Sequence, residues 1–242
     1  MAMLELKPER LDAGEFREQP VSLCGKVFSA DMSGALYWPA EKALIVADLH
    51  LEKGSSFAKG GQMLPPYDTR ETLLRLAAVI DHYEPEAVIC LGDSLHDVAA
   101  AERMNEDDLA ALRMMQEGRD WLWVAGNHDP EIAARLGGYV TGDVMIEGLV
   151  LRHVPTPGHA THEIAAHMHP AARLVMHGYS LRRPCFIGNG KRLVMPAFGA
   201  YCGGLNVLSA EFEPMFGSDG MSVWMLGQEG LYPVATRLLR ED

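Results

Sequence analysis

The stretch Ala43-Leu44-Ile45-Val46-Ala47-Asp48-Leu49-His50 decides the fold, because five apolar residues run directly into a polar loop. A short apolar run of this kind is typical of a buried strand that delivers polar groups at its carboxyl end. The pattern recurs at residues 87–93 (AVICLGD) and 121–129 (WLWVAGNHD). Three such runs predict neighbouring parallel strands whose loops meet at one edge of a sheet.

Two helices are expected between and after these strands. Asp68 can cap a helix over residues 69–83, which carries an apolar stripe on one face. Asn105 can cap another over residues 106–117, which Gly118 would close. The alternation of strands and helices is the pattern of parallel crossover units.

The pattern changes after residue 142, where short strand-like segments separated by Gly and Pro replace the helices. These segments cover residues 144–146, 149–152, 174–176, 186–187, 193–195 and 223–226, with one short helical turn at 163–166. A second sheet packed on the first would explain the change without a second domain. We therefore expect residues 1–242 to form one α/β domain.

Length and composition are those of an ordinary globular protein. The 242 residues are 48% hydrophobic, and no run reaches the roughly 18 consecutive apolar residues of a membrane span. Residues 1–20 are charged throughout and lack the apolar centre of a signal peptide. These features predict a cytoplasmic protein with no membrane partner.

Charge and cysteine usage exclude further classes. Lys and Arg number 21 against 33 Asp and Glu, and a net charge of -12 does not indicate general binding of nucleic acid. The four cysteines form no CxxC pair, which argues against a zinc ribbon or a dithiol redox site. They are Cys24, Cys90, Cys185 and Cys202.

Seven polar side chains at the ends of predicted strands form a candidate metal site. They are Asp48, His50, Asp93, Asn127, His153, His167 and His169. If Asp93 serves twice as a bridge, the seven groups supply four contacts to each of two cations. Oxygen and imidazole ligands without thiolate favour Mn²⁺ or Fe²⁺ and also accept Zn²⁺, whereas four imidazoles disfavour Mg²⁺ alone.

The order of these motifs resembles the calcineurin-like metallophosphoesterase family. The matching fragments are Asp48-Leu49-His50, Gly92-Asp93, Gly126-Asn127-His128-Asp129, His153 and His167-Met168-His169. The resemblance implies an α/β fold in which a two-sheet β sandwich is flanked by helices (αββα). It also implies that Asp48, His50 and His169 hold one metal, that Asn127, His153 and His167 hold the other, and that Asp93 bridges them.

Three later segments resemble the bacterial PdeM branch of that family, which is associated with DNA ligase and helicase genes in repair clusters. They are residues 183–186 (RPCF), 192–199 (RLVMPAFG) and 203–207 (GGLNV). This resemblance implies a manganese-dependent phosphodiesterase acting on single-stranded DNA, with RNA as the other polynucleotide. A histidine three residues after Asp93, here His96, resembles the nuclease branch of the superfamily. Protein phosphatases of the superfamily have Asp at this position, followed by Arg. Ala166 departs from the family pattern, which usually has Gly.

Two histidines are candidate catalytic residues. His128 follows Asn127 and is not needed as a ligand, so its imidazole is free to contact the phosphate or protonate the leaving oxygen. His96 can orient His128 or share that task. Either Asp97 or Asp129 could accept a hydrogen bond from one of the rings and raise its pKa.

Candidate substrate-binding residues are cationic or aromatic. Arg152 and Arg183 lie near the later motifs and could contact a phosphate backbone. Aromatic rings suited to stacking on unpaired bases are Tyr179, Phe186, Phe198 and Tyr201.

Together these features predict a single-domain dinuclear phosphodiesterase, a single-stranded DNA endonuclease of DNA repair in which metal-activated hydroxide attacks in line. A phosphatase or small-nucleotide phosphodiesterase is the alternative enzyme, since the metal core is common to all of them. A non-catalytic partner of repair ligase or helicase is the alternative of another class, but such a scaffold would be expected to have lost ligands. The sequence leaves the native metal, the oligomeric state and the cleavage polarity open.

Overall fold

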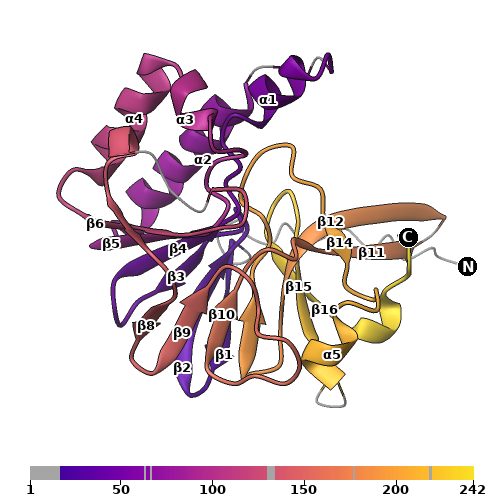
Figure 1. The fold of residues 1–242 in the computed structure, drawn as a ribbon. Helices are drawn as coiled ribbons and strands as arrows, with labels where there is room; N and C mark the ends of the chain where they lie inside the picture. Colours follow the sequence, from indigo (N-terminus) through magenta and orange to yellow (C-terminus); the bar gives the residue numbers. More distant parts are fainter. Residues whose placement is uncertain (1–16, 63, 66, 130–133, 177, 218–219) are drawn as a thin grey trace, which may run out of the picture.

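The computed structural model describes residues 17–62, 64–65, 67–129, 134–176, 178–217 and 220–242. Two β-sheets pack face to face, and helices α1 to α4 cover the outer face of the first sheet (Figure 1). The expected α/β sandwich flanked by helices is therefore confirmed. The charged segment 1–16 lies outside the described residues. Within the described ranges, no helix combines the length and apolar character needed to cross a membrane.

The first sheet runs β1-β2-β3-β4-β5-β6-β7. Its strands are β1 (Glu18–Leu23), β2 (Lys26–Asp31), β3 (Leu36–Trp38), β4 (Ala43–Ala47), β5 (Ala87–Leu91), β6 (Asp120–Val124) and β7 (Tyr139–Thr141). Strands β1 to β4 are antiparallel neighbours, whereas β4 to β7 are parallel. The three predicted strands are β4, β5 and β6, and the last of these starts one residue earlier than expected.

The helices of the first sheet are α1 (Lys53–Lys59), α2 (Asp68–Tyr83), α3 (Ala100–Arg103) and α4 (Glu106–Gln116). Asn105 caps α4 as predicted, since its side chain accepts a 2.8 Å hydrogen bond from the Asp108 N–H. The prediction that Asp68 caps α2 is wrong, because Tyr67 holds the cap position. The Asp68 carboxylate instead accepts a 3.0 Å bond from the Gly54 N–H, which ties α2 to α1.

The second sheet runs β14-β11-β12-β13-β10-β9-β8, with β15 added to β12 and β16 to β15. Its strands are β8 (Val144–Ile146), β9 (Leu149–Arg152), β10 (Glu163–Ala165), β11 (Pro170–Met176), β12 (Tyr179–Gly188), β13 (Arg192–Val194), β14 (Leu205–Asn206), β15 (Ser222–Leu226) and β16 (Leu231–Val234). The predicted helical turn at 163–166 is wrong. Strand β10 lies there between β9 and β13, so sheet pairing decides the conformation of this short buried segment.

Strands β11 and β12 form a hairpin that projects from the sandwich (Figure 1). The remaining short elements are α5 (Glu213–Phe216) and the 3-10 helices η1 (Ala134–Leu136) and η3 (Thr236–Leu238).

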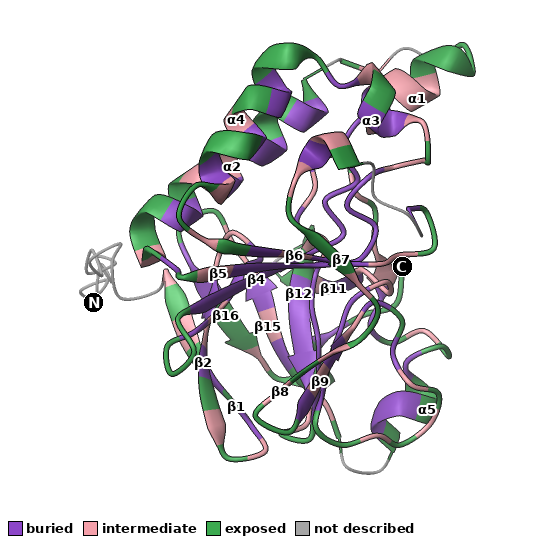
Figure 2. Ribbon diagram, turned by 60° about the vertical axis from the view of Figure 1, so that its left-hand side comes forward, coloured by how far each residue is buried: buried purple, intermediate pink, exposed green. Residues whose placement is uncertain are grey.

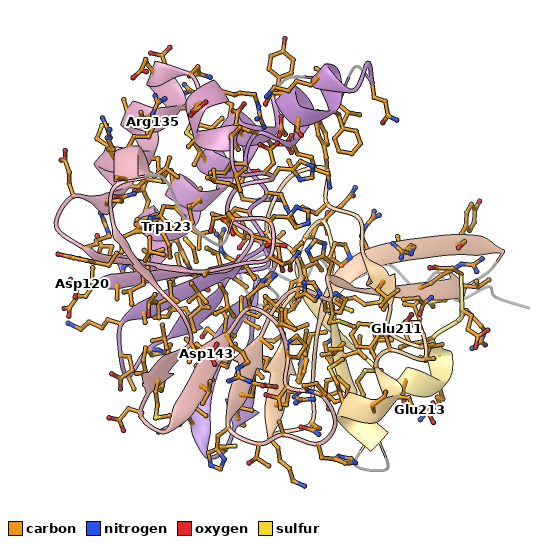
Figure 3. All side chains as sticks on the ribbon, in the orientation of Figure 1. Asp120, Trp123, Arg135, Asp143, Glu211 and Glu213 are labelled. Atoms are coloured by element: carbon orange, nitrogen blue, oxygen red, sulfur yellow. The ribbon has the colours of Figure 1, made fainter. Side chains whose placement is uncertain are left out.

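Apolar side chains fill the space on both faces of the first sheet. One cluster lies under the helices and includes Leu76 of α2, Leu112 of α4 and Trp123 of β6. A second lies between the sheets and includes Phe28, Trp38 and Phe186. Figure 2 shows that β4 is buried, and that helices α2 and α4 each bury one face and expose the other. Figure 3 shows Trp123 on the helical side of the sheet. The site loops therefore rest on a packed scaffold.

Candidate metal centre

The loops after β4, β5 and β6 meet at one edge of the first sheet, as the sequence predicts. The His50 N–H donates a 2.9 Å hydrogen bond to the Asp93 carbonyl, and the Asp48 N–H donates one of 3.3 Å to the Gly92 carbonyl. The His128 N–H donates a 2.9 Å bond to Asp93 Oδ1. The parallel register that aligns Ala47 with Leu91 and Leu91 with Val124 places these loops side by side.

Backbone strain is concentrated at the predicted ligands. Five of the seven have a positive φ: Asp48 (51°), His50 (44°), Asp93 (43°), His167 (67°) and His169 (43°). A side chain other than glycine in this region costs on the order of 1–3 kcal/mol, and such outliers cluster at functional sites. The surrounding fold holds these side chains in positions that the local backbone disfavours.

Two glycines of the motifs are required by close approach. A Cβ at Gly126 would lie 2.1 Å from the Asp93 backbone nitrogen, and one at Gly92 would lie 2.2 Å from the His153 ring. Only glycine therefore fits at either position. Ala166, where the family usually has glycine, is fully buried and is not among the residues with positive φ, so its methyl group fits.

The predicted ligands fall into two groups that share Asp93. In the first group, His169 Nε2 lies 3.3 Å from Asp48 Oδ1 and 3.3 Å from His50 Nε2. His50 Nε2 lies 4.0 Å from Asp93 Oδ2. Two neighbouring ligands each about 2.1 Å from one cation stand about 3.0–3.4 Å apart in octahedral or tetrahedral geometry, and opposite ligands of an octahedron stand about 4.2 Å apart. The two 3.3 Å spacings therefore suit neighbouring ligands of a shared ion, and the 4.0 Å spacing is nearer to that of opposite ligands.

The second group is built around His153. Its Nε2 lies 3.3 Å from Asp93 Oδ2 and 2.9 Å from Asn127 Oδ1. His167 Nδ1 lies 3.2 Å from the same ring nitrogen. The Asp93 Oδ2 atom therefore stands between the two groups, as a bridging carboxylate requires.

Hydrogen bonds on the far sides of two rings orient their lone pairs into the site. His153 Nδ1 lies 3.3 Å from the Leu91 carbonyl, and His169 Nδ1 lies 3.2 Å from the Gly203 carbonyl. Because a carbonyl only accepts, each Nδ1 carries the proton and each Nε2 is left as a donor to a metal. Asp48 Oδ1 is buried and accepts no hydrogen bond within the part of the chain that the structure describes. The donor set fits two divalent cations.

Electrostatics keep the carboxylate charged and one key imidazole neutral. Burial and the neighbouring His169 lower the pKa of His50 to about 3, so its ring is neutral at pH 7. Burial alone would raise the pKa of Asp93, but the adjacent His153 ring and the hydrogen bond from the His128 N–H lower it. An anionic oxygen beside a neutral nitrogen is what a divalent cation needs.

His128 and His96 lie beside the two groups. His128 Nδ1 lies 2.9 Å from the His96 carbonyl oxygen, to which it donates, and its Nε2 lies 3.9 Å from Asp93 Oδ2. The His128 side chain is 43% exposed, so the ring is open to a substrate. The two imidazole rings stack with centroids 5.5 Å apart. His96 therefore orients His128, through its backbone.

Among the described residues, no hydrogen bond joins a histidine ring to the carboxylate of Asp97 or Asp129, the two acceptors that the sequence offers. The Asp97 carboxylate binds the Arg103 guanidinium at 2.6 and 2.8 Å. The Asp129 carboxylate points inward and accepts bonds from the Leu95 and Gly126 N–H groups at 2.8 and 3.2 Å. Burial raises the pKa of Asp129 to about 6.

The two predicted substrate-binding arginines differ in their surroundings. Arg183 lines a cavity of about 150 Å³ together with His169. The Arg152 guanidinium instead contacts the Asp143 carboxylate and, at 2.5 Å, the Thr156 hydroxyl. Arg183 is the better placed of the two.

Two of the four aromatic candidates are buried, and the other two are exposed. Phe186 and Phe198 are fully buried and belong to the core, so the prediction that they stack on bases is wrong. Tyr179 is 81% exposed near the tip of the β11–β12 hairpin, and Tyr201 is 40% exposed.

One residue near the first group was missed. Cys202 Sγ and ring nitrogens of His50 and His169 all lie within 4.8 Å of one another. Burial raises the pKa of this thiol to about 12. Its neighbours are more than 30 residues away in sequence, so no local pattern signals this contact.

The comparisons with known proteins agree with this geometry. The calcineurin-like phosphoesterase family model matches residues 42–183, a range that contains all seven predicted ligands. The crystal structure of Pseudomonas putida nuclease MPE is similar, with a TM-score of 0.69 and 29% identity, covering 90% of this chain and 100% of that chain. The E. coli phosphoesterase Yfce gives a TM-score of 0.36 and 14% identity, over 77% of this chain and 88% of its own.

No protein of curated function matches the chain. The family model nevertheless spans well over half of the 242 residues. The chain therefore belongs to the calcineurin-like phosphoesterase family and is a metal-dependent hydrolase.

Proposed function

We propose that this chain is a dinuclear metal-dependent phosphodiesterase that cuts single-stranded DNA as an endonuclease. The observation that carries the proposal is the position of Asp93 Oδ2, 3.3 Å from His153 Nε2 and 4.0 Å from His50 Nε2. Similarity to a nuclease supports a polynucleotide as the substrate.

The proposed ligands follow the two groups described above. Asp48, His50 and His169 would hold one ion, Asn127, His153 and His167 the other, and Asp93 would contribute to both. Two Mn²⁺ ions held there would neutralise phosphate charge and lower the pKa of a water molecule towards neutrality. Imidazole and oxygen donors together support Mn²⁺, with Fe²⁺ or Zn²⁺ as the other ions this set accepts.

His128 is the proposed general acid. Its Nδ1 proton is held by the His96 carbonyl, so its Nε2 is the atom that faces the substrate. When the ring is protonated, Nε2 can donate to a phosphate oxygen or to the leaving oxygen, and the ring then becomes neutral. His96 acts as a positioning residue through its carbonyl, and its stacked ring limits the rotation of His128.

Local cations guide the substrate in this proposal. Arg183, which lines the cavity beside His169, is the first candidate to bind a phosphate of the strand, and Arg152 is the second. The net charge of -12 opposes tight binding to nucleic acid in general. We therefore expect weak binding that decreases as salt increases.

The cellular role is proposed from the resemblance to the repair-associated branch. A DNA ligase and a helicase are the proposed partners, in the cytoplasm. Affinity capture with the purified ligase and helicase, with and without chelator, tests this association separately from catalysis.

The deciding experiment offers the purified protein circular single-stranded DNA, duplex DNA, RNA and phosphate monoesters with Mn²⁺, Fe²⁺, Zn²⁺ or Mg²⁺. We expect Mn²⁺ to support opening of the single-stranded circle, which only an endonuclease can perform. Asp93→Ala protein purified in parallel controls for contaminating nucleases. Exclusive hydrolysis of monoesters would favour a phosphatase, and absence of turnover on every ester would favour the non-catalytic partner.

A further inference from the structure

Cys202 lies beside the loop that carries Asp48, and hydrogen bonds of the backbone at residues 199–200 hold its segment there. Its Sγ lies 3.7 Å from the Asp48 carbonyl oxygen and 3.8 Å from the Ala200 carbonyl oxygen. The Gly199 N–H donates a 3.1 Å hydrogen bond to the same Asp48 carbonyl. The Ala200 N–H donates one of 2.9 Å to the Thr72 hydroxyl of α2. The thiol is therefore anchored to the loop that carries Asp48.

The sulfur lies close to two histidines of the first group. Cys202 Sγ and ring nitrogens of His50 and His169 are within 4.8 Å of one another. A sulfur about 2.3 Å and a nitrogen about 2.1 Å from one ion stand about 3.6 Å apart in tetrahedral geometry, so ligation requires the thiol and the rings to approach one another by up to about 1.2 Å.

A separate atom points to a cation at the same place. Asp48 is 0% exposed, and its Oδ1 accepts no hydrogen bond among the described residues. This oxygen lies 3.3 Å from Nε2 of His169, which is one of the two histidines close to the Cys202 sulfur. A buried carboxylate oxygen without a donor is costly unless a cation balances it.

The second group differs in its chemistry. Among the described residues, the cluster of His, Cys, Asp and Glu there consists of Asp93, His153 and His167, with no sulfur. A soft thiolate ligand favours Zn²⁺, Cd²⁺ or Fe²⁺ over Mn²⁺, whereas nitrogen and oxygen ligands discriminate less. The two positions therefore differ in the ions they prefer.

We propose that Cys202 is a thiolate ligand of the cation held by Asp48, His50 and His169, which makes this position selective for thiophilic divalent ions. The inference rests on the proposed metal site. On binding, the S–H bond breaks, the sulfur–metal bond forms, and the proton passes to solvent. The first position would then hold a softer ion than the second, so that a mixed-metal centre is the expected state when several ions are available.

The test uses Co²⁺ added to the full-length protein after chelator treatment. Thiolate ligation gives a sulfur-to-cobalt charge-transfer band in the near ultraviolet, whereas d–d bands in the visible report Co²⁺ bound by any ligand set. We compare the wild type with Cys202→Ser and with Cys24→Ser, since Cys24 is the other partly exposed cysteine and its Sγ contacts the Lys191 carbonyl instead. Circular dichroism checks that both variants are folded.

We expect the charge-transfer band in the wild type and in Cys24→Ser, and its loss in Cys202→Ser with the d–d bands retained. Cd²⁺ affinity, measured by competition with a chelator, should fall by about tenfold or more in Cys202→Ser only. Bound Co²⁺ without a charge-transfer band in the wild type would overturn the Cys202 inference and leave the metal site intact. Absence of d–d bands in the wild type would overturn the metal site, and the inference with it. A charge-transfer band that persists in folded Cys202→Ser would assign the sulfur elsewhere.

Discussion

The candidate centre has two walls that are built in different ways. The first wall comes from loops after parallel strands of the first sheet, and the second from segments next to β9, β10 and β11 of the second sheet. The first wall is Asp48, His50, Asp93 and Asn127, and the second wall is His153, His167 and His169. Loops of the first wall hydrogen-bond to one another, for example through the His50 N–H and the Asp93 carbonyl.

The second wall is braced mainly against the first. The His167 N–H donates a 3.1 Å hydrogen bond to Asp48 Oδ2, and His153 Nδ1 bonds to the Leu91 carbonyl at the end of β5. The carboxylates of the first wall therefore serve both as predicted ligands and as supports for the imidazoles opposite. Loss of a first-wall carboxylate should affect the whole centre, whereas loss of a second-wall histidine should affect one position.

The largest expected effect is that of Asp93→Ala. This change removes the oxygen shared by the two groups and the acceptor of the His128 N–H bond. We expect loss of both metals and a fall in activity of about 10³-fold or more, since several kcal/mol of charge stabilisation are lost. Metal analysis after gel filtration and a cleavage assay measure the two effects. Cleavage by Asp93→Ala protein with added Mn²⁺ would show that the site is assigned wrongly.

His128→Ala separates catalysis from metal binding within the first wall. The His128 ring is partly exposed at the edge of the site, and its Nε2 is 3.9 Å from Asp93 Oδ2. Loss of a general acid lowers turnover by about 10²–10⁴-fold. We expect the metal content to stay at the wild-type value and kcat to fall by this factor. A parallel loss of metal would instead make His128 a structural or ligating residue.

His167→Ala tests the second wall. His167 contacts His153 in the second group, and its backbone rather than its ring supports Asp48. We expect one cation to bind at least about 10- to 100-fold more weakly while the other stays bound. Calorimetric titration with Mn²⁺ measures the two sites separately. If both cations are lost, the walls depend on each other more than their hydrogen bonds indicate.

The first wall has a clear local signal in the sequence, and the second has a weaker one. Apolar runs that end at Asp48, Asp93 and Asn127 carry their own signal, because parallel strands align their carboxyl ends. His153, His167 and His169 lie next to short strands in a part of the chain without clear periodicity, so their residue types made them candidate ligands but only the family resemblance assigned them to particular metals. The error at β10 has the same origin, since three buried residues are too few to show a period.

Tertiary contacts account for the remaining differences. The helices were predicted because α2 and α4 are long enough to show an apolar stripe. The capping role predicted for Asp68 was wrong because its carboxylate accepts a hydrogen bond from the Gly54 N–H of α1 instead. Cys202 lies beside residues far along the chain, and His96 contacts His128 through its backbone carbonyl, so neither leaves a pattern in the sequence.

The smallest expected effect is that of Arg183→Gln, at the edge of the second wall. Arg183 lies on β12, where it pairs with Ala172 of β11, and it lines the cavity beside His169. A partly exposed ion pair with phosphate contributes at most about 1 kcal/mol, so KM for single-stranded DNA should rise by up to about fivefold with kcat unchanged. Removing one phosphate contact should also reduce the slope of log affinity against log salt by about 1. Arg173→Gln is the control on the same hairpin, because Arg173 does not line that cavity and its guanidinium is bonded to Ser180. Equal effects of the two variants would mean that the hairpin contributes only net charge, and that the second wall has no specific phosphate contact of its own.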